Sequence, residues 1–378
     1  MEKTDINLIY LTLAGSHLYG LNGPESDIDM KGIAIAQRRY YTGFSRTFEQ
    51  IERKERKGYC CDLDIYNITK LFNLLGGKGN PNLLELLYAD ESCIVFNTYW
   101  GMKLREIRDL FLSKRLKHSF SGFAISQLNR IKTHRNWLLQ PPKKKPERCD
   151  FGMPIDRSLI KKDDIGAFYW VLSNLLKDHF EHEDVEDWLH ERLMELPYLG
   201  LIQRKGVPDD CLLEAQKITG ASDNFIQALK MEQAFINANR DWEQYQNWIE
   251  TRNPYRHELE LKFGYDTKHA IHLCRLLKMC REILTGKGVI VNRRGIDAEE
   301  ILAIKNGAWP YEKLIEWAEK EDLEMNELYK TTALPKTPDI EKLDAICVDM
   351  VEDCCDGLGK WQDWEKTVQD GVLRFKNI

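Results

Sequence analysis

The stretch that decides the fold runs from Gly15 to Asp29 and reads G-S-H-L-Y-G-L-N-G-P-E-S-D-I-D. An apolar run at residues 6–13, I-N-L-I-Y-L-T-L, precedes it, and a second apolar alternation occupies residues 28–36. Short runs that are rich in β-branched residues and bounded by glycine are typical of buried strands. The pattern therefore predicts a strand, a tight turn at Gly15 and a second strand that carries the aspartates.

The turn at Gly15 and Ser16 has the composition of a phosphate-binding turn. Glycine has no Cβ, so its backbone can turn sharply and approach a ligand closely. Ser16 adds a hydroxyl group and an amide beside the turn, and oriented amides bind phosphate oxygens. A Gly-Ser pair alone is a common turn, so it indicates phosphate binding only together with other residues nearby in the sequence.

Two aspartates follow the turn, and they point to metal chemistry. Asp27 and Asp29 are two residues apart on an expected strand, which places both carboxylates on the same face. Adjacent carboxylates repel each other unless a cation lies between them. Carboxylate oxygens are hard ligands that favour Mg²⁺ or Mn²⁺, and these ions in turn bridge to substrate phosphates.

A third carboxylate is expected from the next strand-like segment, residues 59–65, which a helical pattern follows. Two-metal phosphoryl chemistry needs such a ligand from a neighbouring element. Asp62 and Asp64 both lie there and share one face, so the spacing leaves the choice between them open. A D-x-D alone is often a solvated strand end. The turn, the D-x-D and an acidic strand within 65 residues favour catalysis.

These residues resemble the signature of the DNA polymerase β nucleotidyltransferase superfamily, G-S-x(10)-D-I-D. The chain is more closely similar to the predicted nucleotidyltransferase family that includes the RNA-repair-pathway polymerase-β-like proteins. Three stretches carry this narrower resemblance: residues 15–32, residues 62–87 (D-L-D-I-Y to E-L-L), and residues 264–284 (G-Y-D-T-K-H-A to E-I-L). It covers the first hundred residues and about 250–310.

The resemblance implies an α+β fold, with an N-terminal polymerase-β-like nucleotidyltransferase domain on a small mixed sheet and a mainly α-helical region after it. It also implies that Gly15 and Ser16 hold the triphosphate and that Asp27 and Asp29 hold two metal ions, Mg²⁺ or Mn²⁺. Asp62 falls on the family's third acidic position and Asp64 lies beside it, so the choice of third ligand stays open between them. The short insert between the turn and the D-x-D agrees with the narrower family.

A second wall for the nucleotide is expected from the segment 266–284. Ala270, Leu273, Leu277 and Cys280 form one apolar stripe, and Lys268, His272 and Arg275 lie on other faces. Basic residues of a helical region can close over a triphosphate and neutralise its charge. We therefore expect Lys268, Arg275 and His272 to be nucleotide-binding residues. The alternatives are that the two cations pair with surface acids and that His272 is structural.

The chain divides into three expected regions. Residues 1–115 alternate strand-like and helix-like patterns and form the catalytic domain. Residues 116–250 form a helical middle region with a basic, Pro-rich loop at residues 140–154, and residues 251–378 form a helical region that closes over the nucleotide site. His179, His182 and His190 lie among acidic residues without H-E-x-x-H spacing, and we interpret them as residues of an exposed helix face.

Composition bounds the class of protein. The chain has 378 residues, a formal net charge of −6 and ten cysteines without zinc-finger spacing, so we expect reduced thiols in the cytoplasm. No apolar stretch approaches the length of a membrane span, and the N-terminus has no basic-then-apolar leader. Two basic patches, residues 130–135 with Lys143–Lys145, and Lys287 with Arg293–Arg294, are candidate RNA-binding surfaces.

The function expected from these observations is transfer of a nucleotidyl group from a nucleoside triphosphate to an acceptor hydroxyl, with release of pyrophosphate. RNA ends, such as those of tRNA or repaired RNA, are the favoured acceptor because of the family resemblance and the basic patches. A protein side chain is the alternative acceptor, as in an AMPylase-like enzyme. A nucleotide-binding partner protein without turnover is the alternative from a different class.

Overall fold

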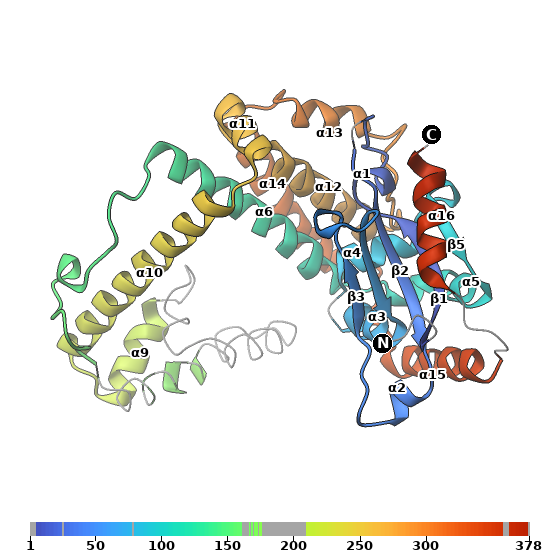
Figure 1. The fold of residues 1–378 in the computed structure, drawn as a ribbon. Helices are drawn as coiled ribbons and strands as arrows, with labels where there is room; N and C mark the ends of the chain where they lie inside the picture. Colours follow the sequence, from blue (N-terminus) through green and yellow to red (C-terminus); the bar gives the residue numbers. More distant parts are fainter. Residues whose placement is uncertain are drawn as a thin grey trace. The chain divides into compact units, whose positions relative to one another are not determined.

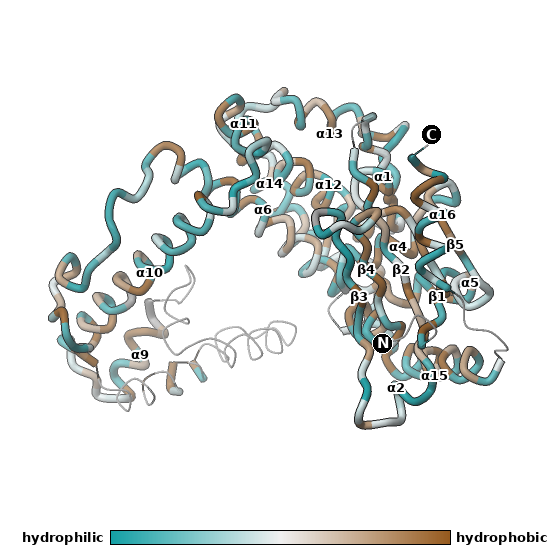
Figure 2. The backbone as a smooth tube through the Cα atoms, in the orientation of Figure 1, coloured by the Kyte–Doolittle hydropathy of each residue, from teal (hydrophilic) through white to brown (hydrophobic). Residues whose placement is uncertain are grey.

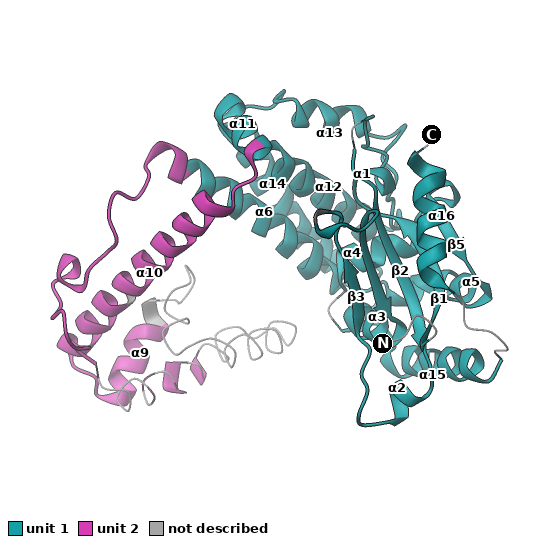
Figure 3. Cartoon of the chain, viewed as in Figure 1, with its two compact units in different colours: residues 1–135, 255–378 teal, residues 136–254 magenta. Residues whose placement is uncertain are grey.

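The computed structural model describes residues 5–24, 26–77, 79–160, 166, 168, 170–172, 174, 175, 209–357 and 363–376. His179, His182 and His190 lie outside the described residues. The chain forms two compact units, one of residues 1–135 with 255–378 and one of residues 136–254 (Figure 3). The chain therefore leaves the first unit once and returns to it.

A five-stranded mixed sheet forms the centre of the first unit among the described residues (Figure 1). Its strands, in the order β3-β4-β2-β1-β5 across the sheet, are β3 (Gln50–Arg53), β4 (Asp62–Asn67), β2 (Asp29–Ala36), β1 (Ile6–Leu13) and β5 (Ile94–Asn97). β2 and β4 are parallel, and the other neighbouring pairs are antiparallel. The N-terminal part thus has the α+β architecture that was expected.

The local sequence explains the inner strands. Every residue of β1 is buried, as its continuous apolar run predicts. β2 begins at Asp29 rather than at residue 28, and β4 begins at Asp62 rather than at residue 59. β4 alternates half-buried and buried residues, so Asp62 and Asp64 lie on one face.

Short helices connect the strands of the sheet. α1 (Gly15–Leu18) follows β1 directly, in agreement with the short insert seen in the sequence. α3 (Ile68–Gly76) follows β4, and the Asn67 side chain accepts a hydrogen bond from the Thr69 amide at its N-cap. α4 (Pro81–Leu87) begins with proline at its first turn. α2 (Arg39–Thr42) and α5 (Tyr99–Glu106) complete this part.

The C-terminal helices return to the sheet and share its core. They are α11 (Pro254–Phe263), α12 (Thr267–Leu284), α13 (Ala298–Lys305), α14 (Tyr311–Thr331), α15 (Ile340–Asp356) and α16 (Trp364–Lys376). α12 packs against α13 and α14, α15 packs against α3 and β2, and α16 packs against β5 (Figure 1). One continuous apolar cluster joins residues from both ends of the chain. The region expected to close over the site is therefore part of the same unit as the sheet.

The middle of the chain is helical in its described residues. α6 (Leu116–Leu139) lies mostly in the first unit, because that unit extends to residue 135. The second unit contains α9 (Asp209–Thr219) and α10 (Asp223–Thr251), and hydrophobic and hydrophilic residues alternate along α10 (Figure 2). Phe168, Leu172, Ala215 and Leu229 are buried in a separate core of this unit.

Two expectations from composition concerned the state of the cysteines and the lack of a membrane-spanning segment. All ten cysteines are free thiols. Among the residues that the structure describes, no helix combines the length and the apolar character that a membrane crossing requires.

Candidate functional site

The Gly15 turn and the side chain of Asp29 are in direct contact. β1 and β2 are antiparallel neighbours, and the Ala14 amide donates a hydrogen bond to the Asp29 carbonyl oxygen over 2.8 Å. Gly15 has φ +60°, a conformation that favours glycine. A Cβ atom at Gly15 would lie 2.6 Å from Asp29 Oδ2, so only glycine allows this approach. The turn and the carboxylate therefore form one site.

Three carboxylates lie near the beginning of two parallel strands, and in the described residues they do not form a group whose ligand atoms all lie within 4.8 Å of one another. Asp29 is the first residue of β2, and its register partner is Asp62, the first residue of β4. Asp27 lies two residues before β2, in the loop rather than on the strand. Burial raises the pKa of Asp29, and the nearby carboxylates of Asp62 and Asp27 raise it further, although Lys54 and Lys31 oppose them. Negative charge is thus concentrated at this edge of the sheet.

The register distinguishes Asp62 from Asp64. Asp62 lies beside Asp29, whereas the register partner of Asp64 is Lys31. Asp62 Oδ1 accepts a hydrogen bond from the Glu55 amide over 2.8 Å, which fixes its orientation. Because parallel partners on one face are neighbours, Asp62 is the carboxylate that can share a ligand with Asp29.

Lys54 provides a positive charge to the same strand end. Its Nζ atom lies 3.6 Å from Asp62 Oδ2 and 3.5 Å from Asp64 Oδ1. Burial opposes its positive charge, yet Asp64 and Asp62 raise the pKa of Lys54 above its usual value. Lys54 therefore partly neutralises the acidic strand. The sequence reasoning did not identify this residue, since its role depends on the pairing of β3 with β4.

The donor set fits a hard divalent cation. Asp27, Asp29 and Asp62 offer carboxylate oxygens, the ligands that Mg²⁺ and Mn²⁺ prefer. The raised pKa of Asp29 shows that burial and like charges disfavour its ionised form in the protein alone. A bound cation would remove this cost. Metal binding at these three residues stays a prediction.

Lys268 approaches the carboxylates from the first turn of α12. Asp266 caps this helix, and its Oδ1 accepts hydrogen bonds from the amides of Lys268 and His269. Burial lowers the pKa of Lys268, and the nearby cations Arg256 and Lys305 lower it further, whereas Asp27 and Asp266 act in the opposite direction. Lys268 is therefore near Asp27, on the side of the site where the sequence predicts a basic wall.

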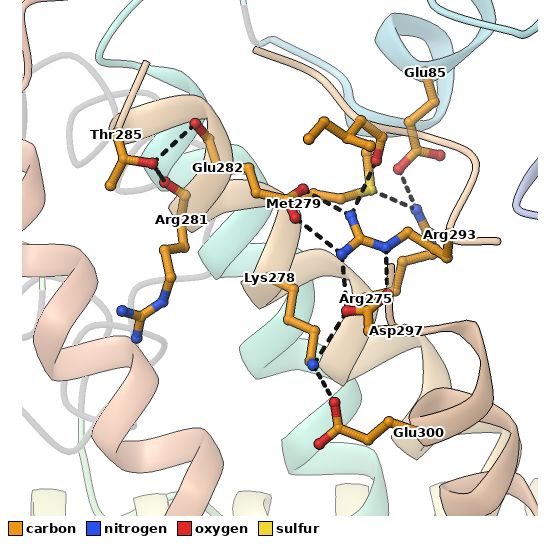
Figure 4. Close-up of polar contacts among 11 residues, drawn as sticks. Glu85, Arg275, Lys278, Met279, Arg281, Glu282, Thr285, Arg293, Asp297 and Glu300 are labelled. Atoms are coloured by element: carbon orange, nitrogen blue, oxygen red, sulfur yellow. Dashed lines mark hydrogen bonds and ion pairs between the residues drawn. The ribbon is translucent and has the colours of Figure 1, made fainter. Parts of the chain in front are cut away.

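Arg275 occupies a different place from the one expected. Its side chain is buried and forms an ion pair with buried Glu85 (Figure 4). Its Cζ atom lies 3.7 Å from the centroid of the Tyr19 ring. The Tyr19 hydroxyl donates to Glu85 Oε2 over 2.6 Å. Tyr19 is the C-cap of α1. The structure thus assigns Arg275 to the packing that supports the Gly15 turn, rather than to an open nucleotide-binding surface.

His272 lies half-buried on α12 near Arg275. Burial lowers the pKa of His272 to about 3, and the positive charges of Arg275 and His269 contribute. The imidazole is therefore neutral at physiological pH. It can form hydrogen bonds to a nucleotide, but it brings no positive charge to a triphosphate.

The basic patches expected to bind RNA are engaged within the chain only in part, since Arg130, Lys143 and Lys287 are exposed. Arg293 is buried and binds Glu282 and Asp297 (Figure 4), and Arg294 donates to the Gly20 carbonyl and to Asn22. Arg294 thus contacts the loop after α1, and the Arg293 amide donates to the Tyr19 carbonyl oxygen. Burial removes Arg293 from the candidate RNA-binding surface, whereas Arg294 is exposed. In the other patch, Lys132 pairs with Glu319, and Lys144 pairs with Asp150 in the second unit.

A pocket of about 660 Å³ opens beside Asp27. His17 and residues 22–24 and 26–28 line one side, and Glu55, Cys60 and the end of α16 line another. Asp27 is one of the residues that line this pocket, whereas Gly15, Ser16 and the other two carboxylates are not.

Comparison with curated proteins and comparison with solved structures give no match. A family model does match, and it covers the residues that form the turn, the three carboxylates and the whole sheet. Residues 1–142 match RlaP, the RNA repair pathway DNA polymerase beta family, which confirms the resemblance over this region and identifies it as polymerase-β-like nucleotidyltransferase sequence.

Proposed function

We propose that this protein transfers a nucleoside monophosphate from a nucleoside triphosphate to an acceptor hydroxyl on RNA. The observation that carries this proposal is the contact of the Gly15 turn with Asp29, whose register partner is Asp62. A phosphate-binding turn and a metal-binding carboxylate set are the two parts that nucleotidyl transfer requires, and here they adjoin. The family of residues 1–142 supports the same class of reaction.

Asp27, Asp29 and Asp62 would hold the Mg²⁺ or Mn²⁺ ions. When bound, these ions would neutralise phosphate charge and lower the pKa of the attacking hydroxyl. The carboxylates' own contribution is a fixed position: Asp29 and Asp62 are held by the β2–β4 register, and Asp62 is held further by the Glu55 amide. Little rearrangement is then needed when substrate binds.

The remaining steps use groups of the chain. The backbone at Gly15 and Ser16 would bind the phosphate oxygens, and Lys268 would offset their charge from the side of Asp27. The acceptor oxygen attacks the α-phosphorus, a new oxygen–phosphorus bond forms, and the bond to the β-phosphate oxygen breaks, so that pyrophosphate leaves. Asp62 is the candidate to accept the proton of the hydroxyl, since it is one of the three carboxylates of the proposed site and lies at the end of β4 rather than in its interior.

RNA is the proposed acceptor because the family is one of RNA repair. The most direct experiment incubates the protein with each α-³²P-labelled nucleoside triphosphate and Mg²⁺, with and without tRNA. Label in RNA supports the proposal. Label in polypeptide instead would indicate a protein acceptor, and binding of nucleotide without any transfer would indicate a non-catalytic partner protein.

A double variant links the activity to the site. Asp27→Ala with Asp29→Ala should abolish transfer while the far-ultraviolet circular dichroism spectrum is retained. Asp344→Ala with Asp349→Ala is a matched control, because both residues are exposed on α15. Wild-type turnover by the first double variant would refute the assignment of the site.

A further inference from the structure

A second group of potential metal ligands lies in the first unit, outside the carboxylate site. His134, Asp266 and His269 each offer one ligand atom, and these atoms lie within 4.8 Å of one another. His134 is on α6, Asp266 is the N-cap of α12, and His269 is in the first turn of α12. Asp266 and His269 are buried, and His134 is partly buried. The group thus joins two helices that are far apart in the sequence.

We propose that His134, Asp266 and His269 form a binding site for a Zn²⁺-class divalent cation, separate from the carboxylates of the proposed nucleotidyl transfer. Two imidazole nitrogens and one carboxylate oxygen are typical ligands of Zn²⁺, and three protein ligands leave a coordination position for water. This donor set differs from the all-oxygen set of Asp27, Asp29 and Asp62. The two sites should therefore prefer different ions.

The hydrogen bonds of His269 prepare its Nε2 atom for a cation. His269 Nδ1 lies 2.7 Å from Gln127 Oε1, and the Gln127 amide nitrogen donates to Ser126 over 3.3 Å, which sets the direction of the amide. Nδ1 therefore carries the proton, and Nε2 carries the lone pair.

His134 is oriented in the same manner by a carboxylate. Its Nδ1 atom lies 3.1 Å from Oε1 of Glu260, which is buried. When Nδ1 donates its proton to Glu260, Nε2 carries the lone pair. A carboxylate behind a histidine is the usual second partner of metal-binding imidazoles, because it fixes the tautomer and increases the basicity of the ring.

Asp266 has one oxygen available in addition to its role as a helix cap. Oδ1 accepts from the Lys268 and His269 amides over 2.8 and 3.2 Å. Oδ2 instead faces His269 Nε2 at 3.6 Å. The cap fixes the carboxylate, and its second oxygen points toward the imidazole lone pair.

In the structure, the guanidinium group of Arg256 occupies the place proposed for the divalent cation. Arg256 Nη1 lies 3.1 Å from His269 Nε2 and 3.2 Å from Asp266 Oδ2, so one guanidinium nitrogen contacts two of the proposed ligand atoms. Arg256 is 35% exposed, which allows its side chain to leave. A divalent ion would replace this guanidinium and tie α6 to the turn that carries Lys268. Metal and Arg256 therefore compete for one place.

The test uses the full chain with Asp27→Asn and Asp29→Asn, so that the carboxylate site does not dominate metal binding. After treatment with EDTA and its removal, Co²⁺ is added as a spectroscopic probe, and Zn²⁺ binding is measured by calorimetry. We expect one equivalent of Co²⁺ with visible absorption bands of nitrogen coordination. Absence of such bands at stoichiometric Co²⁺ would overturn the proposal.

Three further variants keep the test independent of misfolding. His134→Gln should weaken Zn²⁺ binding by more than about tenfold, since even outer-shell partners of a metal contribute about 10–100-fold. His118→Gln, on the same helix beside Tyr329, is the matched control and should bind as the parent does. Arg256→Ala should tighten binding because the competing cation is gone. Equal affinities for the two histidine variants, or no gain in Arg256→Ala, would refute the site.

Discussion

The buried pair of Arg275 and Glu85 provides a test of what supports the Gly15 turn. The two side chains are 1% and 0% exposed, so each charge depends on the other. Arg275→Met leaves the Glu85 carboxylate buried with the Tyr19 hydroxyl as its hydrogen-bond donor. Removing one member of a buried pair costs about 3–5 kcal/mol, because an uncompensated charge remains in the interior. The same loss is expected for Glu85→Gln, which leaves the guanidinium uncompensated.

The double variant separates this explanation from a general loss of packing. With both charges removed, neither is left uncompensated, so Arg275→Met with Glu85→Gln should cost at least about 2 kcal/mol less than the sum of the single variants. The free energy of unfolding is measured by urea denaturation followed by circular dichroism. Arg281→Met on the same helix is the control. Its partners include partly exposed Glu324, and a solvent-exposed pair contributes about 0–1 kcal/mol.

The result also decides the role of Arg275. Suppose that Arg275→Met lowers the free energy of unfolding by less than about 1 kcal/mol and instead raises KM for the nucleoside triphosphate. The buried-pair argument is then refuted, and Arg275 is a nucleotide ligand, as the sequence predicts. If stability falls and the coupling is present, Arg275 acts through the turn.

Three further predictions concern the carboxylate site. Asp62→Asn should lower kcat by about 10²–10⁴-fold, whereas Asp64→Asn should lower it far less; equal losses in steady-state kinetics would refute the register argument. Gly15→Ala should abolish turnover because its Cβ would displace Asp29, while Gly286→Ala, with a similar positive φ and open space around it, should retain activity. Asp29→Asn should raise Tm of the EDTA-treated protein at neutral pH, because the raised pKa of Asp29 means that its ionised form destabilises the fold. This gain should shrink as the pH falls through the raised pKa toward the usual carboxyl value and be absent below it; a gain in Tm that grows in acid would contradict the argument.

The elements next to the motif could be predicted because their signals are local. The apolar run of β1, the glycine turn and the helix after Asn67 follow from periodicity and from capping within a few residues. The D-x-D motif could be recognised from the sequence because Asp27 and Asp29 lie two residues apart. The short length of the insert between the turn and the D-x-D motif also followed directly from the number of residues between them.

The choice among similar residues required the tertiary structure. Asp62 and Asp64 have the same spacing and the same face, and only the parallel register places Asp62 beside Asp29. Lys268 and Arg275 are both basic residues of α12, yet one approaches Asp27 and the other is buried against Glu85. No local pattern distinguishes them, since burial depends on what packs against the helix.

The sequence by itself therefore predicted the chemistry of this protein's N-terminal region, with a turn for phosphate and carboxylates for metal, and residues 1–142 match a polymerase-β-like family. The tertiary structure decided which of the predicted residues lie near one another and which are buried in the packing. It also brought His134 within reach of His269, although 135 residues separate them along the chain (269 − 134). The physical reason is that strand and helix signals arise between near neighbours, whereas charge pairing, burial and ligand sites arise between segments that meet only when the core forms.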